Sequence, residues 1–255
     1  MLVESNCGII KNDLLNYGGE IVKYIVCNSE TAVLNRMYDE FEKNLEDGAV
    51  ISLPEHIINT QFTNRMIDDC KMGKYRYKHV IVLGQREFAD IDIEENFGLY
   101  RFARRELLKK LDIDLKNVYY PKCQDSNEGL DELQAYKEVL EDNPIDVAIV
   151  VLGSDGGILD YRYVDEDNKN IHLVEFSDEE KNQLQSSGME INSNKLVSIG
   201  YENLMSARNL FVVAVGSDKR KYIAELFEND NEDNKTILSV LNQHKNLIIF
   251  TDKEA

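Results

Sequence analysis

The sequence predicts an α/β fold: a three-layer sandwich with a mainly parallel sheet. Short apolar runs rich in β-branched residues recur along the chain, and they alternate with segments whose apolar residues repeat at helical spacing. Buried parallel strands are continuous apolar runs rather than alternating ones. The runs expected to be strands are Ile21–Cys27, Ala49–Leu53, Lys78–Leu83, Asp146–Leu152, Leu210–Val215 and Asn246–Phe250.

Amphipathic helices are expected between these strands. Asn28 or Ser29 suits the N-cap of a first helix, because short polar side chains accept hydrogen bonds from the free N–H groups of the first turn. Further helices are expected over Ile57–Cys70, Phe97–Leu111, Leu130–Asp142 and Lys219–Glu228. The polar segment Asp165–Asn194 lacks such a pattern, and we expect it to form a lid or a hairpin.

No linker, low-complexity tract or internal repeat divides the chain. Residues 1–255 are therefore expected to form one domain, in which residues 1–20 are an N-terminal extension. The four cysteines are scattered without metal-ligand spacing, which predicts reduced thiols and no metal site. The start of the chain lacks the apolar core of a signal peptide, so we expect a cytoplasmic protein.

The charge of the chain excludes several classes of partner. The 255 residues include 47 Asp and Glu against 29 Lys and Arg, a formal net charge of −18. Nucleic acids and anionic membranes are bound by basic faces, so neither partner is expected. No apolar stretch approaches the ~20 residues needed to span a bilayer.

A glycine-rich turn follows the strand Asp146–Leu152, where the sequence is VVLGSDGGILDY. Ligands of open parallel sheets bind at the carboxyl ends of the strands. Gly153, Gly156 and Gly157 permit a tight turn there, and Asp155 would project from it. Asp155 is thus either a ligand-binding or catalytic group, or a turn carboxylate that caps the following backbone.

The next junction, Ser198–Leu226, has the sequence SIGYENLMSARNLFVVAVGSDKRKYIAEL. Together, the two segments resemble the glucosamine-6-phosphate deaminase/isomerase family and the related 6-phosphogluconolactonases, whose motifs are G-x-G-x-D-G-H, T-x-G-x-x-x-L-x-x-A-R and G-x-x-K. His79–Phe88, Tyr100–Ile113 and Leu241–Ala255 are similar to further segments of the deaminases. The resemblance implies the same fold, and a cofactor-free reaction in which a pyranose ring opens and a carboxylate moves a proton between C2 and C1.

The resemblance also implies that several groups of the family's site have been replaced. The glycine-rich loop that cradles the sugar phosphate falls on Leu53–Ile58, where Glu55 and His56 stand and no glycine remains. The proton-abstracting Asp falls on Arg86, followed by Glu87. A guanidinium is always protonated and cannot act as a general base.

On the other side of the implied site, the ring-opening His falls on Gly157, and the Glu that supports it falls on Arg162. Asp155 is the surviving catalytic candidate, and Lys219 matches the phosphate-contacting Lys. The implied substrate-binding residues are Lys219, Gly153, Gly156, Arg86 and Arg162. The implied cleft-lining residues are Glu55, His56, Glu87 and Gly157.

Three kinds of function stay open at this point. The first is an enzyme of amino-sugar phosphate metabolism, an isomerase/deaminase or a 6-phosphogluconolactonase, since Asn96–Leu107 also resembles the lactonase motif S-N-x-G-x-A-R. The second is a non-catalytic paralogue that binds a sugar phosphate or another anion, or that regulates an active subunit. The third is a new activity built from Arg86, Arg162, Asp155 and Lys219.

Deaminase turnover is not expected, because loss of one acid–base group costs ~10²–10⁴ in rate and several are replaced. The expected partner is a small sugar phosphate or other anion, with no cofactor, and a homo-oligomer is left open. Unpaired buried charge costs several kcal/mol. We therefore expect Arg86 or Arg162 to lie within salt-bridge distance of Asp155 or Glu55.

Overall fold

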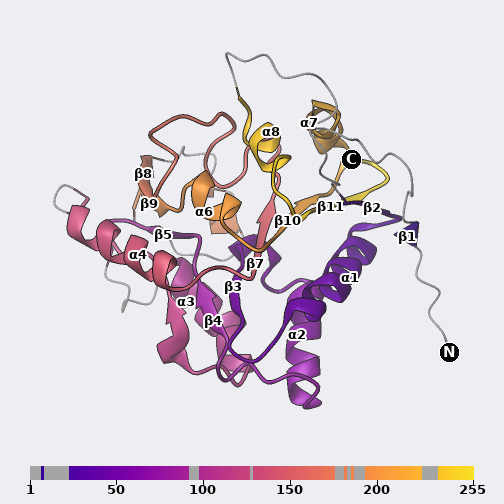
Figure 1. Cartoon of the computed structure of the whole chain (residues 1–255), viewed down its shortest axis with the longest axis horizontal. Helices are drawn as coiled ribbons and strands as arrows, with labels where there is room; N and C mark the ends of the chain where they lie inside the picture. Colours follow the sequence, from indigo (N-terminus) through magenta and orange to yellow (C-terminus); the bar gives the residue numbers. More distant parts are fainter. Residues whose placement is uncertain are drawn as a thin grey trace.

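A central sheet organises the computed structural model, which describes residues 7–8, 23–91, 98–126, 129–175, 181–182, 185–186, 193–225 and 235–255 (Figure 1). Within these residues the sheet has eight strands in the order β1-β2-β11-β10-β7-β3-β4-β6. Every neighbouring pair is parallel except β1 and β2. The strands are β1 (Cys7–Gly8), β2 (Lys23–Cys27), β3 (Val50–Ser52), β4 (Ile81–Leu83), β6 (Val118–Tyr119), β7 (Val147–Val151), β10 (Asn209–Ala214) and β11 (Leu247–Asp252).

Helices cover both faces of this sheet. The helices are α1 (Glu30–Phe41), α2 (Gln61–Lys71), α3 (Leu99–Glu106), α4 (Leu130–Asp142), α6 (Tyr201–Met205), α7 (Arg220–Glu225) and α8 (Ile237–Leu241). Val147 and Ile149 of β7 pack in one core with α1, α2 and α3, whereas Ala148 and Val150 pack in a second core with α4, α6, α7 and α8. Side chains of a strand alternate between its two faces, so the sheet is the middle of three layers. The predicted α/β sandwich is confirmed.

All six strands expected from the sequence are present, with small shifts at their ends; Ile21 and Val22, the expected start of the first strand, lie outside the described residues. The strand expected from Lys78 begins only at Ile81, because the Val80 N–H bonds back to the Tyr77 carbonyl in a turn. Likewise, α2 begins at Gln61 rather than Ile57, because a 3₁₀ turn at Glu55–Ile57 and a positive φ at Asn59 precede it. Ser29 is the N-cap of α1, as expected, and its side chain accepts from the Ala32 N–H.

The remaining regular elements are short. A second, three-stranded antiparallel sheet has the order β5-β9-β8, with β5 at Arg86–Phe88, β8 at His172–Glu175 and β9 at Lys195–Ser198. β8 lies within the segment Asp165–Asn194, and it pairs with β9, which directly follows that segment. Most of residues 176–192, and with them the expected lid, lie outside the described residues. Four more 3₁₀ turns lie at Glu42–Asn44, Leu108–Lys110, Leu115–Asn117 and Ser217–Lys219.

The cysteines differ in part from expectation. β1 places Cys7 opposite Cys27 in the antiparallel register, and Cys27 is disulfide-bonded. The prediction of four reduced thiols is therefore wrong at Cys27, while Cys70 and Cys123 are free. No helix in the described part of the chain is long and apolar enough to cross a membrane.

Candidate functional site

The candidate site lies where β3, β4 and β7 end. The 3₁₀ turn after β3 carries Glu55 and His56, and β5 begins with Arg86 three residues after β4 ends. The loop after β7 carries the glycine turn and then Asp160. Parallel strands present their carboxyl ends along one edge of a sheet, so these segments meet although they are far apart in the sequence.

Arg86 is held between two carboxylates. Its Nη1 donates to Asp160 Oδ1 at 3.0 Å, and its Nη2 donates to Glu55 Oε1. The exposed fractions of the side chains are 9% for Arg86, 6% for Glu55 and 4% for Asp160. The expected ion pair between Arg86 and Glu55 is thus confirmed. Asp160 was not identified from the sequence, where its single signal is that it closely follows the glycine turn.

A histidine flanks each carboxylate. His172 Nε2 lies 3.7 Å from Asp160 Oδ2, and His172 Nδ1 lies 2.9 Å from the Asn170 carbonyl. His56 Nδ1 lies 3.6 Å from Glu55 Oε1, and desolvation lowers the pKa of this imidazole. The residues therefore follow one another in the order His56, Glu55, Arg86, Asp160, His172. We call the buried trio Glu55, Arg86 and Asp160 the Arg86 cluster.

The second sheet positions Arg86 and His172, the two basic residues on either side of Asp160. Arg86 of β5 and His172 of β8 are both directly opposite Ser198 of β9, so the three form one row across the sheet. Residues directly opposite in a sheet have side chains on the same face. Arg86 and His172 therefore approach Asp160 from one face, and the short strands fix both positions.

Asp155 has a local role in the glycine turn. Its Oδ1 accepts from the Gly157 N–H at 2.9 Å, and the Gly153 N–H bonds to the Gly157 carbonyl at 2.7 Å. Gly156 has a φ of +82°, and a Cβ there would meet the Tyr222 ring at 2.5 Å. This geometry agrees with the alternative in which Asp155 caps its own turn.

Arg162 and Lys219 have their own acidic partners. Arg162 Nη2 lies 2.9 Å from Glu225 Oε1, and its guanidinium stacks over the rings of Tyr222 and Tyr163. Lys219 lies in the turn after Gly216, and its ammonium contacts the carboxylate of Asp218. The substrate-binding residues implied by the resemblance are therefore divided among the Arg86 cluster, the glycine turn and these two separate pairs.

Glu87 does not line the cleft, and that assignment is corrected. It follows Arg86 in β5, so its side chain points to the opposite face, where it is 1% exposed. There it accepts from the backbone N–H groups of Phe88, Leu99 and Tyr100 at 2.7–2.8 Å, which caps the start of α3. Burial raises the pKa of Glu87 to about 7, against the lowering effect of these hydrogen bonds.

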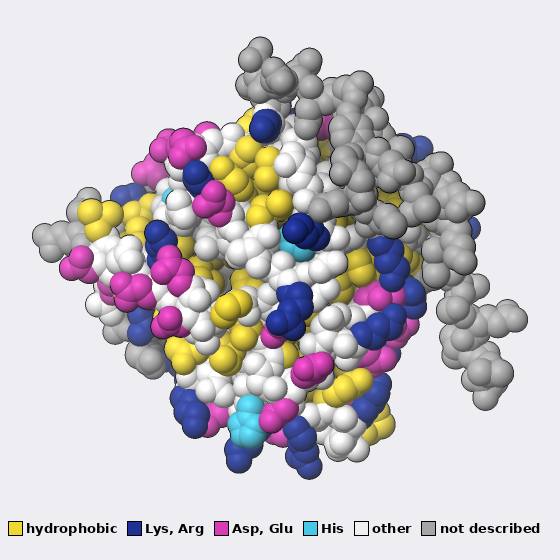
Figure 2. Space-filling view, in the orientation of Figure 1, with side chains coloured by type: hydrophobic (Ala, Val, Ile, Leu, Met, Phe, Trp, Pro, Cys, Tyr) yellow, Lys and Arg dark blue, Asp and Glu magenta, His cyan; other side chains and the backbone are white. Residues whose placement is uncertain are grey.

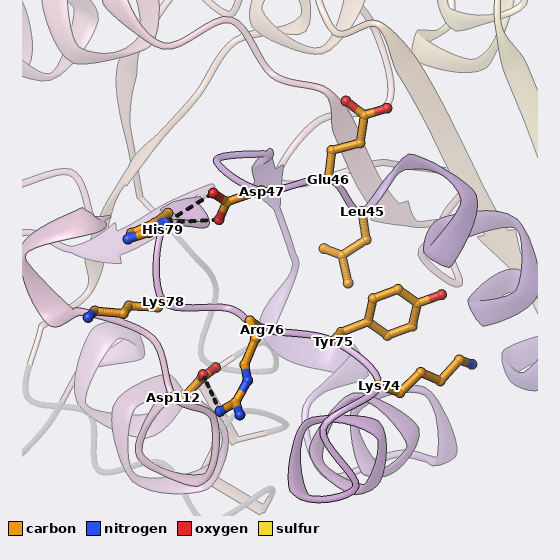
Figure 3. Close-up of a pocket in the computed structure, with 9 residues that line it drawn as sticks. All are labelled: Leu45, Glu46, Asp47, Lys74, Tyr75, Arg76, Lys78, His79 and Asp112. Carbon is orange, nitrogen blue, oxygen red and sulfur yellow. Dashed lines mark hydrogen bonds and ion pairs between the residues drawn. The ribbon is translucent and has the colours of Figure 1, made fainter.

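One pocket lies at the other end of the sheet, before β3 and β4 begin. It has a volume of about 590 Å³ and is formed by residues 45–47 before β3 and by 74–76, 78 and 79 before β4, together with Asp112 (Figure 3). Its charges are largely paired: Arg76 Nη1 lies 3.5 Å from Asp112, and His79 Nδ1 lies 2.9 Å from Asp47. Figure 3 shows Lys78 and Glu46 extending away from the other residues. The cationic side chains of Lys74, Arg76 and Lys78 do not converge on one point, so the pocket lacks the arrangement of an anion site.

Two further observations bear on ligands. Within the described ranges, no group of three or more His, Cys, Asp and Glu side chains is placed to hold a metal ion. Figure 2 shows Lys and Arg side chains interspersed with Asp and Glu over the face in view.

The fold is shared with enzymes of known structure that act on sugar phosphates. The chain aligns with a monomeric glucosamine-6-phosphate deaminase at a TM-score of 0.77 and 14% identity, covering 91% of this chain and 98% of that one. It aligns with the 6-phosphogluconolactonase of Trypanosoma brucei at a TM-score of 0.70 and 15% identity, covering 92% and 97%. These likenesses show a shared fold.

Sequence comparison finds relatives among the glucosamine-6-phosphate deaminases. The chain is 22% identical over 242 residues to the glucosamine-6-phosphate deaminase of Mycoplasma mycoides subsp. mycoides, covering 92% of this chain and 96% of that protein. It is 23% identical over 189 residues to the deaminase of Bacillus cytotoxicus, covering 73% and 71%. No family model matches the chain. The chain thus resembles the glucosamine-6-phosphate deaminases over most of its length, which confirms the resemblance expected from the sequence.

Proposed function

We propose that the chain acts in amino-sugar phosphate metabolism as a relative of the deaminases that does not catalyse deamination. The name of its sequence relatives supports the substrate class. The Arg86 cluster supports the loss of turnover: where the resemblance implies the proton-abstracting carboxylate, Arg86 stands with both guanidinium ends engaged by Glu55 and Asp160.

The remaining carboxylates do not restore the missing base. A general base must reach the proton that it removes, within about 2.6–3.2 Å or through one water. Glu87 is buried on the other face and is occupied by three backbone N–H groups. Asp155 is bonded to its own turn, and Asp160 is paired with Arg86. Each replaced acid–base group is expected to cost ~10²–10⁴ in rate.

The test is a coupled assay with purified protein and glucosamine 6-phosphate, in which fructose 6-phosphate and ammonium are both measured. We expect no turnover in the usual enzymatic range of ~1–10³ s⁻¹. A rate in that range would overturn the proposal. Hydrolysis of 6-phosphogluconolactone is measured in parallel, and we expect none above the uncatalysed rate, because Gly157 also replaces the histidine that the lactonases keep.

A non-catalytic relative can still bind its ligand. A ligand present at 100 times its Kd stabilises the folded state by about 2.7 kcal/mol, which thermal unfolding detects. Thermal unfolding with glucosamine 6-phosphate, fructose 6-phosphate and 6-phosphogluconate, against glucosamine as the control without a phosphate, therefore tests binding apart from turnover. We expect stabilisation by the phosphates and none by glucosamine.

A further inference from the structure

The carboxylate of Glu55 lies at a point where two nitrogen-bearing groups converge. Arg86 Nη2 donates to Glu55 Oε1, and His56 Nδ1 lies 3.6 Å from the same oxygen. The Glu55 side chain is 6% exposed, so the oxygen is largely removed from water. A guanidinium that presents N–H groups to an oxyanion in a desolvated place is the usual protein recognition element for carboxylates and phosphates.

The Arg86 cluster holds two carboxylates and one guanidinium, so it has one negative charge in excess. Asp160 alone neutralises Arg86, through a 3.0 Å bond to Nη1, and Glu55 brings a second negative charge to a buried place that holds one guanidinium. Buried charge without a matching partner is costly. Asp160 is sufficient as the counter-ion of Arg86. The carboxylate of Glu55 is therefore a second anion, bound at Nη2.

The local backbone leaves the Glu55 side chain able to exchange. Glu55 begins a single 3₁₀ turn, Glu55–Ile57, which is tied by the bonds from Ile57 N to Pro54 O and from Ile58 N to Glu55 O. Neither bond uses the Glu55 side chain. The neighbouring His56 side chain is 53% exposed, so the turn borders solvent. Rotation about the side-chain bonds of Glu55 can thus carry its carboxylate outward without breaking the turn.

We propose that Arg86 and His56 form a binding site for a small oxyanion, a carboxylate or a phosphomonoester, and that Glu55 occupies this site from within the chain. The site opens when Glu55 rotates outward, so Glu55 is an autoinhibitory group. The inference rests on the proposed function only for the identity of a sugar phosphate as ligand. The anion site itself follows from the contacts of Glu55.

The test compares wild type with Glu55→Ala, which empties the site, and Glu55→Gln, which fills it without charge. Asp160 still neutralises Arg86 in both variants, so both are expected to fold, and circular dichroism checks this. Formate, inorganic phosphate and glucosamine 6-phosphate are titrated at constant ionic strength, with binding followed by calorimetry and by thermal unfolding. We expect Glu55→Ala to bind formate and phosphate at least tenfold more tightly than wild type, and Glu55→Gln to show a smaller gain.

Two controls make the result specific. Glu225→Ala removes the carboxylate partner of Arg162, a pair that is about one-third exposed, and is expected to bring no gain. His56→Ala in the Glu55→Ala background leaves Arg86 and Asp160 paired, and is expected to weaken anion binding severalfold. Equal gains in Glu55→Ala and Glu225→Ala, or no gain in folded Glu55→Ala, would overturn the inference. Neither result bears on whether the wild type deaminates glucosamine 6-phosphate, so the two proposals fail separately.

Discussion

The guanidinium of Arg86 donates to the carboxylate of Asp160 at 3.0 Å, although the two residues lie 74 positions apart. One begins β5 and the other follows the glycine turn after β7. Their contact connects the central sheet to the second sheet at the edge where the ligands of parallel sheets bind. Arg86, which stands where the resemblance implies a catalytic carboxylate, is thus also a structural link.

The first prediction concerns the stability supplied by this link. Arg86→Ala leaves Glu55 and Asp160 without their shared cation in a buried place. Breaking a buried ion pair from one side costs about 3–5 kcal/mol, and we expect the free energy of unfolding to fall by that amount in urea denaturation. Arg162→Ala is the matched control, because its pair with Glu225 is about one-third exposed and should contribute about 0–1 kcal/mol. Equal losses in the two variants would contradict the prediction.

The second prediction concerns the pH dependence that Glu87 gives to folding. Burial raises the pKa of Glu87 to about 7, whereas an unfolded-chain glutamate titrates near 4.3. Between these values the folded state binds a proton that the unfolded state has lost. The contribution of Glu87 to stability is therefore complete below about pH 4.3, declines as the pH rises to about 7, and is level above that.

The measurement is the difference in unfolding free energy between wild type and Glu87→Gln across pH 4 to 8. We expect the wild type to lose stability relative to Glu87→Gln with a slope of at most about 1.4 kcal/mol per pH unit. Glu225→Gln, a change on a partly exposed side chain, is the control and should follow the wild type. If the unfolding free energy of the wild type minus that of Glu87→Gln increased with pH, the raised pKa of Glu87 would be contradicted.

The third prediction separates the two roles of Asp155. If its carboxylate only caps the turn through the Gly157 N–H, Asp155→Asn keeps the accepting oxygen and should change stability by less than about 0.5 kcal/mol. Asp155→Ala loses the bond and should cost about 1 kcal/mol. Thermal unfolding of both variants checks this. A large loss in Asp155→Asn would show that the charge itself is needed at this position.

The fourth prediction concerns the close approach of α6 to the chain before β8. A Cβ on Gly200 would lie 2.2 Å from the Lys169 carbonyl oxygen, and the atoms that it would meet all belong to the backbone. Gly200→Ala is expected to cost about 1–3 kcal/mol through overpacking. Gly73→Ala is the comparison: its φ is +72° and nothing lies within 4 Å of its Cβ, so it tests backbone strain alone, at about 1–2 kcal/mol. A Gly200→Ala protein as stable as wild type would show that this contact can relax.

The long apolar strands were predictable because each carries its own signal. Val147–Val151 and Asn209–Ala214 are buried on both faces, and a run of β-branched residues is what such a strand requires. Of the second sheet, the sequence predicted only a lid or a hairpin over Asp165–Asn194, because its strands are three or four residues long and hold charged residues such as Arg86 and Glu87. In strands that short, pairing is decided by tertiary contacts, which leave no periodic pattern.

The site was predictable only in part, for a related reason. The ion pair of Arg86 with Glu55 followed from a charge balance between neighbouring loops. The partnership with Asp160 depends on how the chain returns after the glycine turn, and the capping role of Glu87 depends on where α3 begins. Both are three-dimensional facts. The single domain and the roles of the remaining site residues stay predictions.

The strand order has a consequence for the biosynthesis of the protein. β2, near the start of the chain, joins the parallel sheet through β11, which ends at Asp252. A ribosome releases residues from the first to the last, so β2 waits for almost the whole chain to emerge before it reaches its parallel partner. β3, β4 and β7 can pair earlier, whereas Arg86 meets β9 only after Ser198 has been made. A nascent chain stalled before that point would hold Arg86 and Glu55 on an unfinished edge, so the cleft can be completed only after Ser198 has been made.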